Sequence, residues 1–363
     1  MEIDSQDIEL LCIGNAMVDV FAKCGDREFG LDQPVQHIPM EKMREILSAL
    51  PRYSVCSGGG AANAAKIAGM LGIKTCFIGA LGAASVNENE TPGISDQSDR
   101  SGQSGQSDQF GKQFEYELGK AGVQTILPCK NTPTGVCLIL QMPDNKTKIA
   151  ACPSAALELS QEDINEDLIR RAEAVVLDGF MLGRRSLVRY ILELSDRYGT
   201  AVALDLSATG LAYERAAEII TYARAYPLII FMNEDEADAF YRALSKKDSP
   251  PKNENGLGPE MTSLFKTFTS NDIFPIINVK LGMRGAVVFA GGNVYRESTV
   301  PVIPLEITGA GDAFCAAFLA AWIREKPLSV CAAFGNRAAR TVLDVNGTNA
   351  DPKALKNLGR ELK

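Results

Sequence analysis

The sequence contains a single histidine, His37, among its 363 residues. This scarcity excludes most zinc sites built on histidine and leaves little room for a Ser-His-Asp arrangement. His37 lies between two prolines in the turn-like segment 34–39, where a solvated or packing role is expected, and contact with a substrate stays open.

Other patterns are missing as well. None of the nine cysteines belongs to a C-x-x-C pair, and several lie in apolar segments, which predicts reduced core cysteines in a cytoplasmic protein. The longest apolar run, 313–323, is too short to span a bilayer, and the acidic N-terminus shows no signal-peptide pattern. With a net charge of −8, the chain is not expected to bind nucleic acid or an anionic membrane, although a local anion pocket stays open.

Two common phosphate-binding motifs are also absent. The chain has no G-x-x-x-x-G-K-[ST], so any phosphate chemistry is not of the P-loop type. The run Ser57-Gly58-Gly59-Gly60 enters an Ala-rich segment, but Asn63 occupies the place of the third glycine of a dinucleotide fingerprint. We therefore interpret this run as a close approach of backbone to ligand, or as a tightly packed helix start.

Short β-branched runs alternate with amphipathic helical patterns over most of the chain. This alternation predicts an α/β fold with a mostly parallel sheet that is covered by helices on both faces. Ligands of such sheets bind beyond the carboxyl ends of the strands. The predicted strands are 8–13, 75–78, 174–177, 201–206, 228–232 and 276–280, and the predicted helices are 40–50, 61–71, 110–121, 160–171, 186–198, 234–244 and 313–323.

Three segments depart from this alternation. Strand-like patterns with polar interruptions predict a small, half-exposed β-sheet lid drawn from about 15–38 and 130–153. Residues 85–109 are rich in Ser, Gly, Gln and Asn, and this composition predicts a mobile polar insertion. The polar segment 245–258 is expected to be a further exposed loop.

The most informative segment is Thr308-Gly309-Ala310-Gly311-Asp312, just before an apolar helix. The two glycines allow backbone amides to converge, and a helix N-terminus favours an anion. Asp312 repels an anion unless it has a task there, such as taking the proton of an attacking hydroxyl. A plain Gly-rich turn with Asp312 as a helix cap fits equally well.

Polar side chains follow two other predicted elements near the N-terminus. Asn15 and Asp19 come after the first strand, and this pair suits hydrogen bonds to vicinal hydroxyls of a sugar, although polar capping of a turn explains it too. Asn63 offers both a donor and an acceptor just after Gly58 and Gly59.

The second half of the chain holds two more candidate segments. Asn233 and Glu236 follow a predicted strand, where they are placed to organise magnesium and its waters beside phosphates, or simply to begin a helix. Lys280 ends a strand and is followed by a turn with Gly282 and Gly285, which suits a nucleotide or a plain hairpin.

Together and in this order, these motifs resemble the ribokinase-like (PfkB) family of sugar and nucleoside kinases. The resemblance runs over nearly the whole chain and includes Pro133-Thr134-Gly135. It implies one ribokinase-like domain over 1–363, a three-layer α/β sandwich with a β-sheet lid. It also implies ATP- and Mg²⁺-dependent phosphorylation of a hydroxymethyl group.

Carried over by position, the resemblance implies a role for each motif. Asp312 is the base, and the amides of Gly309, Ala310 and Gly311 form the anion hole. The acceptor-binding residues are Asn15, Asp19, Gly58, Gly59 and Asn63. The nucleotide and phosphate residues are Asn233, Glu236, Lys280, Gly282, Gly285 and Asn336, with Glu236 serving magnesium through water.

The chain departs from the family at three points. Glu306-Ile307 replace a usual Asp-Thr whose Asp helps form a monovalent-cation site in some members, so a potassium requirement stays open. After Gly79-Ala80-Leu81-Gly82, the usual charged residue and Asp are missing. Lys280 stands where many members have Thr.

Several phrases are similar to adenosine kinases, including Asp205-Leu206-Ser207-Ala208. The acceptor, a sugar or a nucleoside, stays open, with adenosine kinase as the specific alternative. A non-catalytic sugar or nucleoside sensor is an alternative of another class, and a dinucleotide-dependent oxidoreductase is a weaker one. The enzyme is expected to act in the cytoplasm as a monomer or a homodimer.

Overall fold

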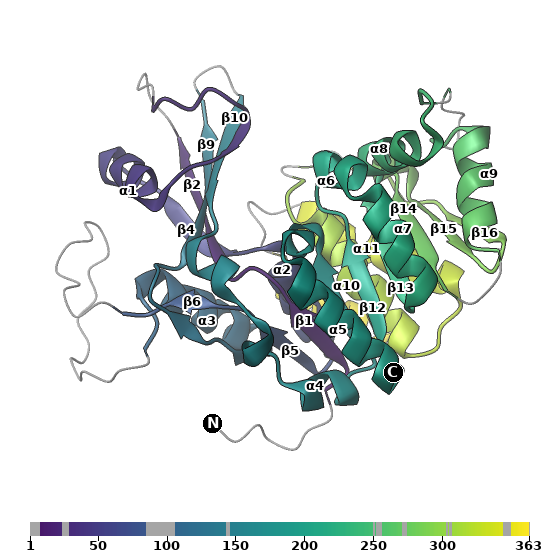
Figure 1. Cartoon of the computed structure of the whole chain (residues 1–363), viewed down its shortest axis with the longest axis horizontal. Helices are drawn as coiled ribbons and strands as arrows, with labels where there is room; N and C mark the ends of the chain where they lie inside the picture. The colour runs from purple at the N-terminus through teal and green to yellow at the C-terminus, as the bar shows by residue number, and fades with distance from the viewer. Residues whose placement is uncertain are drawn as a thin grey trace.

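The computed structural model describes residues 8–23, 29–84, 106–142, 146–249, 251, 256–270, 274–302, 304, 307–343 and 350–362. Two β-sheets organise this part of the chain (Figure 1). A nine-stranded sheet forms the centre of the main body, and a five-stranded sheet stands beside it. The α/β fold class is confirmed.

The main sheet has the strand order β16-β15-β14-β13-β12-β11-β1-β5-β7. All neighbouring strands from β14 to β7 are parallel, and only β15 and β16 are antiparallel. The six strands predicted from apolar runs are all present. The bounds are β1 Leu10–Ile13, β5 Thr75–Ile78, β7 Gln124–Ile126, β11 Ala174–Asp178, β12 Ala201–Asp205, β13 Leu228–Asn233, β14 Ile276–Lys280, β15 Ala286–Ala290 and β16 Asn293–Glu297.

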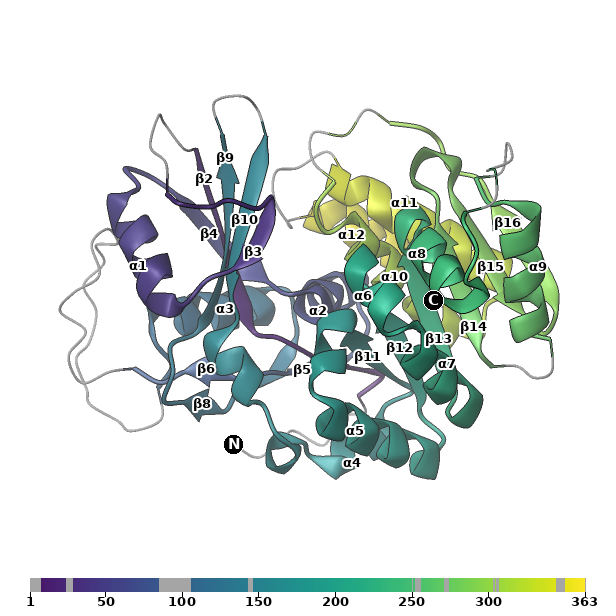
Figure 2. The same cartoon turned by 45° about the horizontal axis from the view of Figure 1, so that its top comes forward.

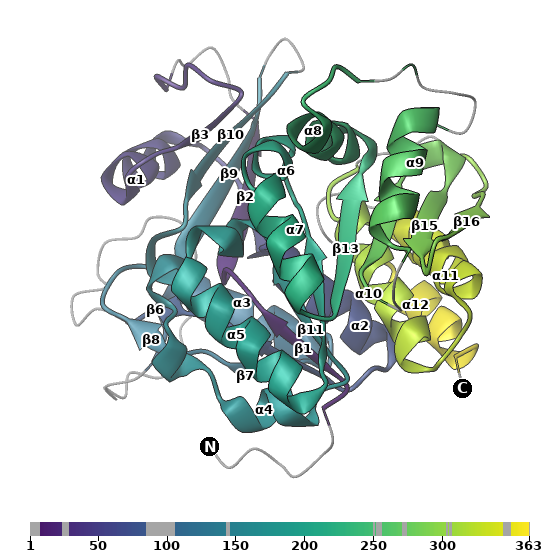
Figure 3. The same ribbon diagram turned by 45° about the vertical axis from the view of Figure 1, so that its right-hand side comes forward.

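Helices cover both faces of this sheet, as Figure 3 shows. Alternate strand residues enter two separate apolar clusters: Leu10 and Cys12 join one, whereas Leu11 and Ile13 join the other. The strands are therefore apolar on both faces, as expected for a buried parallel sheet. One layer contains α2 Gly60–Leu71, α10 Ala310–Ile323, α11 Leu328–Leu343 and α12 Pro352–Arg360; the other contains α4 Glu166–Arg171, α5 Arg185–Tyr198, α7 Ala216–Ala225, α8 Glu234–Ser245 and α9 Pro259–Phe268.

The second sheet has the order β3-β10-β9-β2-β4. It rises from the main body where β1 passes into β2, and helix α1 (Met40–Ala49) lies against it (Figures 1 and 2). His37, in β3, is exposed. The strands are β2 Met17–Lys23, β3 Val35–His37, β4 Ser54–Gly58, β9 Gly135–Gln141 and β10 Thr147–Cys152. A separate small sheet is thus confirmed, with β4 added from outside the two predicted ranges.

Two local predictions differ from the structure. The helix predicted over 160–171 is broken into η2 (Gln161–Asp163) and α4, because Ile164 is extended and Asn165 caps α4 by accepting from the Asp167 N–H. Of the predicted insertion 85–109, residues 85–105 lie outside the described residues. Gln106–Asp108 are ordered: Ser107 bridges Ala83, and Asp108 caps α3 (Gln109–Lys120).

The remaining elements connect these layers. β6 (Leu81–Gly82) and β8 (Cys129–Lys130) form a two-stranded pair, and α6 (Thr209–Glu214) precedes α7. Three short 3₁₀ turns are η1 Ser154–Glu158, η3 Gly179–Gly183 and η4 Gly282–Arg284. Eight described cysteines carry free thiols, and no described helix is long and apolar enough to cross a membrane.

Helix α10 is held against the main sheet by aromatic packing. The Phe318 ring is fully buried and lies 5.3 Å from that of Phe231 on β13 and 6.2 Å from that of Phe314. We expect Phe318→Ala to lower the free energy of unfolding by about 3–5 kcal/mol, because it leaves a cavity under α10. Urea denaturation measures this loss.

The matched control is Tyr116→Ala on α3, since Tyr116 is 64% exposed. This variant should change the free energy of unfolding by no more than about 0.5 kcal/mol. Equal effects of the two substitutions would contradict the packing role of Phe318.

Candidate active site

The site centres on the first turn of α10. Gly309 has φ 82°, a left-handed conformation that favours glycine, and the helix begins at the next residue. Asp312 is the third residue of the helix and is partly exposed. The structure thus presents an acidic side chain at an accessible helix N-terminus, where the backbone favours negative ligands.

The amides of this turn are not all equally available. The Ala310 N–H donates to the Ile307 carbonyl at 3.3 Å, because residues 307–310 close a tight turn. Among the described residues, no acceptor pairs with the N–H of Gly309 or Gly311. Of the three amides predicted to form the anion hole, that of Ala310 is thus engaged within the turn in this conformation.

Asp312 is held by a neighbouring helix. Its Oδ2 accepts a hydrogen bond from Asn63 Nδ2 at 3.0 Å, and a methyl group placed on Gly60 would lie 3.6 Å from its Oδ1. Withdrawal from water, with the repulsion of Asp205, raises the pKa of the Asp312 carboxyl to about 7, although Asn63 and Lys280 oppose this shift. A carboxyl group that titrates near neutrality suits proton transfer.

The predicted acceptor residues lie around the N-terminal end of α2. Gly59 has φ 97°, and a methyl group on it would overlap the carbonyl oxygen of Asn15. Gly58 lies directly under the Asp19 carboxylate, which leaves no room for a side chain there. Asn15, Asp19 and Asn63 are all nearly buried. The structure brings this group to the side of α2 that also carries the partner of Asp312.

Two further polar residues join this group from the end of β11. Arg184 Nη2 donates to Asn15 Oδ1 at 2.7 Å, and Nη1 donates to the Ala156 carbonyl. Asp178 is buried beside Gly14 and Gly60, and burial raises its pKa. Sequence reasoning missed both residues, although Asp178 directly follows a predicted strand, which is a signal that could have found it.

A buried lysine supports the Gly58-Gly59 turn from below. Lys66 Nζ donates to the Ser57 carbonyl at 2.9 Å, while Glu117 of α3 accepts from both the N–H and the hydroxyl of Ser57 at 2.7 Å. Burial lowers the pKa of Lys66, against the attraction of nearby acids. The position of Ser57 is therefore fixed from two helices.

Asn233 and Glu236 form a reciprocal cap at the start of α8. The Glu236 N–H donates to Asn233 Oδ1, and both Glu236 oxygens accept from Asn233, at 2.8 and 2.9 Å. Glu236 is nearly buried, and burial raises its pKa. The capping interpretation is confirmed, and each Glu236 carboxylate oxygen accepts one of these hydrogen bonds.

Lys280 turns toward the start of α10. Its Nζ pairs with Asp205 Oδ2 at 2.6 Å, and a methyl group on Gly311 would lie 3.1 Å from that nitrogen. Burial lowers the pKa of Lys280, but the pairing with Asp205 and the nearby Glu236 outweigh burial and raise it. Asp205 was missed as a site residue, although it is the one charge in the predicted strand 201–206.

The remaining nucleotide candidates lie around β14 to β16. Gly282 and Gly285 have φ 57° and 88° in the connection between the antiparallel strands β14 and β15, so the hairpin interpretation is confirmed. A methyl group on Gly285 would overlap the Glu297 carbonyl. Asn336 of α11 donates to that same carbonyl at 3.1 Å. These two residues serve local packing and are not in contact with Asp312 in this structure.

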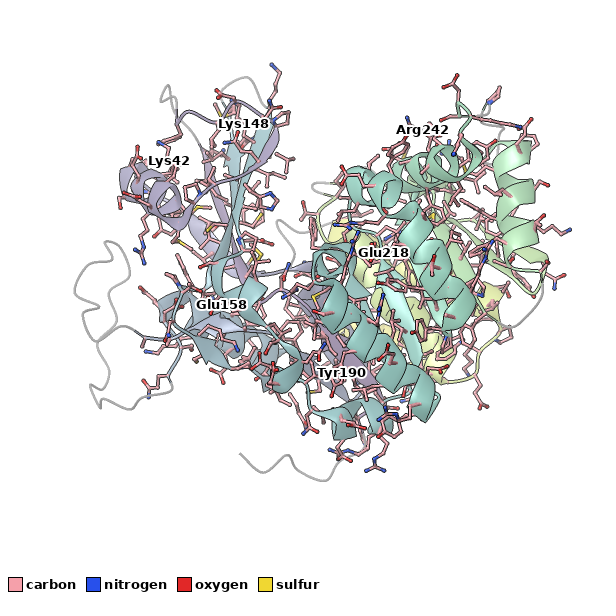
Figure 4. All side chains as sticks on the ribbon, viewed as in Figure 1. Lys42, Lys148, Glu158, Tyr190, Glu218 and Arg242 are labelled. Atoms are coloured by element: carbon pink, nitrogen blue, oxygen red, sulfur yellow. The ribbon has the colours of Figure 1, made fainter. Side chains whose placement is uncertain are left out.

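A separate hollow lies on the other side of the main body, around α5. Its lining consists of Gln161, Arg185, Ser186, Arg189, Tyr190 and Glu193. Figure 4 labels Tyr190 there, on the helical layer away from the second sheet. None of the candidate residues lines this hollow.

The fold and the site together define an α/β kinase of the ribokinase-like class. A comparison with known families agrees: residues 104–354 match the pfkB family carbohydrate kinases, and the chain belongs to that family. It is therefore a phosphotransferase with an alcohol group as acceptor. This finding replaces the two alternatives of another class, the non-catalytic sensor and the oxidoreductase.

Similar sequences and structures cover nearly the whole chain. A 5-dehydro-2-deoxygluconokinase of Halalkalibacterium halodurans is 24% identical over 95% of this chain and 91% of its own length. The structure of a probable sugar kinase from Rhizobium etli has a TM-score of 0.78 at 20% identity, over 98% of both chains. That of adenosine kinase from Sinorhizobium meliloti has a TM-score of 0.77 at 22% identity, over 99% of this chain and 100% of its own.

The raised pKa of Asp312 has a consequence for stability. The usual pKa of this group is 3.8, so between about pH 4 and 7 the folded protein holds a proton that the unfolded chain releases. Stability from this group is therefore lost as pH rises toward 7. Asp312→Asn removes the charge, and we expect its melting temperature to exceed that of the wild type at about pH 8.

The difference should shrink as pH is lowered toward 5, and differential scanning fluorimetry over this range measures it. The control is Asp196→Asn at an exposed carboxyl on α5, which should show no such trend. A pH-independent difference for Asp312→Asn would show that its carboxyl titrates normally.

Proposed function

We propose that this kinase transfers the γ-phosphoryl group of ATP to a hydroxymethyl group of a sugar or nucleoside, with Asp312 as the base. The observation that carries the proposal is the Asp312 carboxyl group: it belongs to a partly exposed residue, lies at the N-terminus of α10, and has its pKa raised to about 7. A cap that only closes a helix needs neither access to solvent nor a raised pKa.

The reaction then divides among residues that lie close together. The acceptor oxygen loses its proton to Asp312 and forms a bond to the γ-phosphorus, while the bond from that phosphorus to the bridging oxygen breaks and ADP leaves. The N–H groups of Gly309 and Gly311 stabilise the charge on the transferred group, and Ala310 joins them if its turn opens. Asn63 holds the Asp312 carboxyl in position.

The donor set fits a magnesium ion that is held mainly by water and phosphate. Magnesium prefers oxygen ligands and keeps several waters, and the Glu236 carboxylate retains lone pairs for such water. When bound, the ion neutralises charge on the phosphates. Among the described residues, no group of three or more His, Cys, Asp or Glu forms a metal site by itself. Glu306 lies outside the described residues, so the potassium requirement stays open.

We assign the nucleotide to the edge formed by the ends of β13 and β14. Asn233 and Lys280 are paired in the sheet register at this edge, and Gly282 follows in the next turn. Gly285 and Asn336 border the same region through the Glu297 carbonyl. The second sheet, with lid segments 15–38 and 130–153, then covers the acceptor, since Asp19 lies in β2.

Two observations bear on the acceptor class. Arg184 beside Asn15 supports an acidic sugar, and relatives named 5-dehydro-2-deoxygluconokinase agree with that class. A nucleoside is supported by apolar residues on the face of β2 and β9 that carries Asp19, namely Phe21 and Ile139, which are paired and only partly buried. A nucleobase would pack on such a face, so adenosine kinase stays the second candidate.

Removal of the proposed base should abolish most turnover. We expect Asp312→Asn to lower kcat by roughly 10²- to 10⁴-fold with little change in acceptor affinity, because only the proton acceptor is lost. Steady-state ADP release and acceptor titration measure the two effects. Asp196→Asn is the surface control, and a near wild-type kcat for Asp312→Asn would disprove its role as base.

A matched pair of acceptors tests the phosphorylated group. We expect ADP release with a sugar, sugar acid or nucleoside that has a free CH₂OH, and none with the same compound lacking that hydroxyl. Arg184→Met should raise KM for an acidic sugar selectively, whereas Phe21→Ala should raise KM for a nucleoside selectively. Turnover of the deoxy compound at the same rate would contradict the proposed acceptor group.

A further inference from the structure

The ammonium group of Lys280 occupies an unusual place beside the proposed base. It lies 3.1 Å from the point where a side chain on Gly311 would begin, one residue before Asp312. Its own strand, β14, is separated from α10 in sequence by β15 and β16, so only the fold brings the two together. The absence of a side chain at Gly311 allows the ammonium group to approach the first turn of α10 this closely.

The Lys280 ammonium group has more N–H donors than it has acceptors among the described residues. A lysine has three N–H donors, and among the described residues only Asp205 accepts from Lys280, at 2.6 Å. The side chain is 14% exposed and that of Asp205 is 11% exposed, so the pair is largely withdrawn from solvent. An anion at the helix N-terminus would meet both the unused donors and the open amides.

The charge around this place is otherwise acidic. Asp205 and Asp178 both act on Asp312, and Glu236 acts on Lys280 from the start of α8. A phosphoryl group would bring further negative charge into this cluster. Lys280 lies against the first turn of α10 and attracts the Asp312 carboxylate, and its attraction for the incoming group offsets part of this repulsion.

We propose that Lys280 is a catalytic residue whose ammonium group turns from Asp205 to the γ-phosphoryl group when ATP binds, and stays on that group as it is transferred. The proposal rests on the proposed kinase reaction. The same bonds form and break: acceptor oxygen to γ-phosphorus forms, γ-phosphorus to bridging oxygen breaks, and the hydroxyl proton goes to Asp312. Lys280 keeps all its protons and supplies charge where the transferred oxygens lie.

The alternative is a purely structural ion pair. In that case Lys280 only neutralises Asp205, and its loss would leave a largely buried carboxylate that repels Asp312 and raises the Asp312 pKa further. Both roles predict a slow Lys280→Met enzyme. They differ in nucleotide preference and in the response to removal of the Asp205 charge.

Nucleotide binding gives the first test, with ATP and ADP titrated calorimetrically against the full-length protein in the presence of magnesium and without acceptor. Because the proposed contact is to the group that ADP lacks, Lys280→Met should weaken ATP about tenfold or more and leave ADP within about threefold. Lys112→Met, at an exposed position on α3, is the control and should change neither. Equal weakening of both nucleotides, or of neither, would overturn the proposal.

The second test is the double variant Lys280→Met/Asp205→Asn, which removes both charges of the ion pair. Because no buried Asp205 carboxylate is left without its partner, this variant separates the two roles even if Lys280→Met alone does not fold. A structural pair predicts that the double variant recovers the wild-type kcat. The proposal predicts that the double variant recovers the wild-type pH dependence of kcat, since the repulsion on Asp312 is gone, while kcat stays reduced by about 10²- to 10³-fold. Recovery of kcat would refute the catalytic role.

The two tests separate this inference from the kinase proposal. If no acceptor supports ADP release by the wild type, the proposed reaction fails, but the ATP and ADP titrations still decide whether Lys280 binds the terminal phosphate. If the wild type turns over and Lys280→Met binds ATP and ADP unchanged, only the role of Lys280 is disproved.

Discussion

The hydrogen bond between Asn63 and Asp312 joins the proposed acceptor site to the proposed phosphate site. The proposed proton transfer to Asp312 depends on this contact. Asn63 belongs to α2, which begins at the turn with Gly58 and Gly59, whereas Asp312 belongs to α10, which begins at the proposed anion hole. Both helices lie on the same face of the main sheet and pack against each other. Helix packing and this hydrogen bond thus together hold the proposed acceptor site and the proposed phosphate site next to each other.

Two opposing effects determine the pKa of the Asp312 carboxyl group. A helix N-terminus stabilises a carboxylate, yet withdrawal from water and the neighbouring Asp205 and Asp178 favour its protonated form. The balance leaves the group able to change its charge near neutral pH. Phe314 and Phe318 pack on Phe231 and so fix α10 against the main sheet. This packing keeps the Asp312 carboxyl group in the partly dehydrated position that raises its pKa.

Much of the fold could be predicted from local sequence. The parallel strands are short runs that are apolar on both faces, and such runs are evident without any knowledge of their neighbours. β4 was missed because its sequence, Ser54–Gly58, is half polar and becomes a strand only by pairing with β2. The break before α4 depends on the capping side chain of Asn165, which the helical spacing over 160–171 concealed.

Candidate site residues could be predicted where a single short segment contains the whole motif. They could not be predicted where the ends of different strands come together. The turn before Asp312 and the capping pair Asn233 and Glu236 are each contained in a few residues. Asp178 ends β11 and Arg184 follows the same strand after η3, whereas Asp205 ends the neighbouring strand β12, so Asp205 joins the other two only through sheet order. Sequence spacing holds no information on which strand ends will be neighbours.

The crossing between the two sheets has a mechanical consequence. β1 runs into β2 through Asn15, and β4 runs into α2 through Gly59, so these two of the covalent connections pass through residues assigned to the acceptor. A rotation of the small sheet therefore cannot leave those residues unmoved. Binding at the proposed acceptor site and the angle between the two sheets would then be coupled, so a substitution that stiffens either connection should also change the affinity for the acceptor.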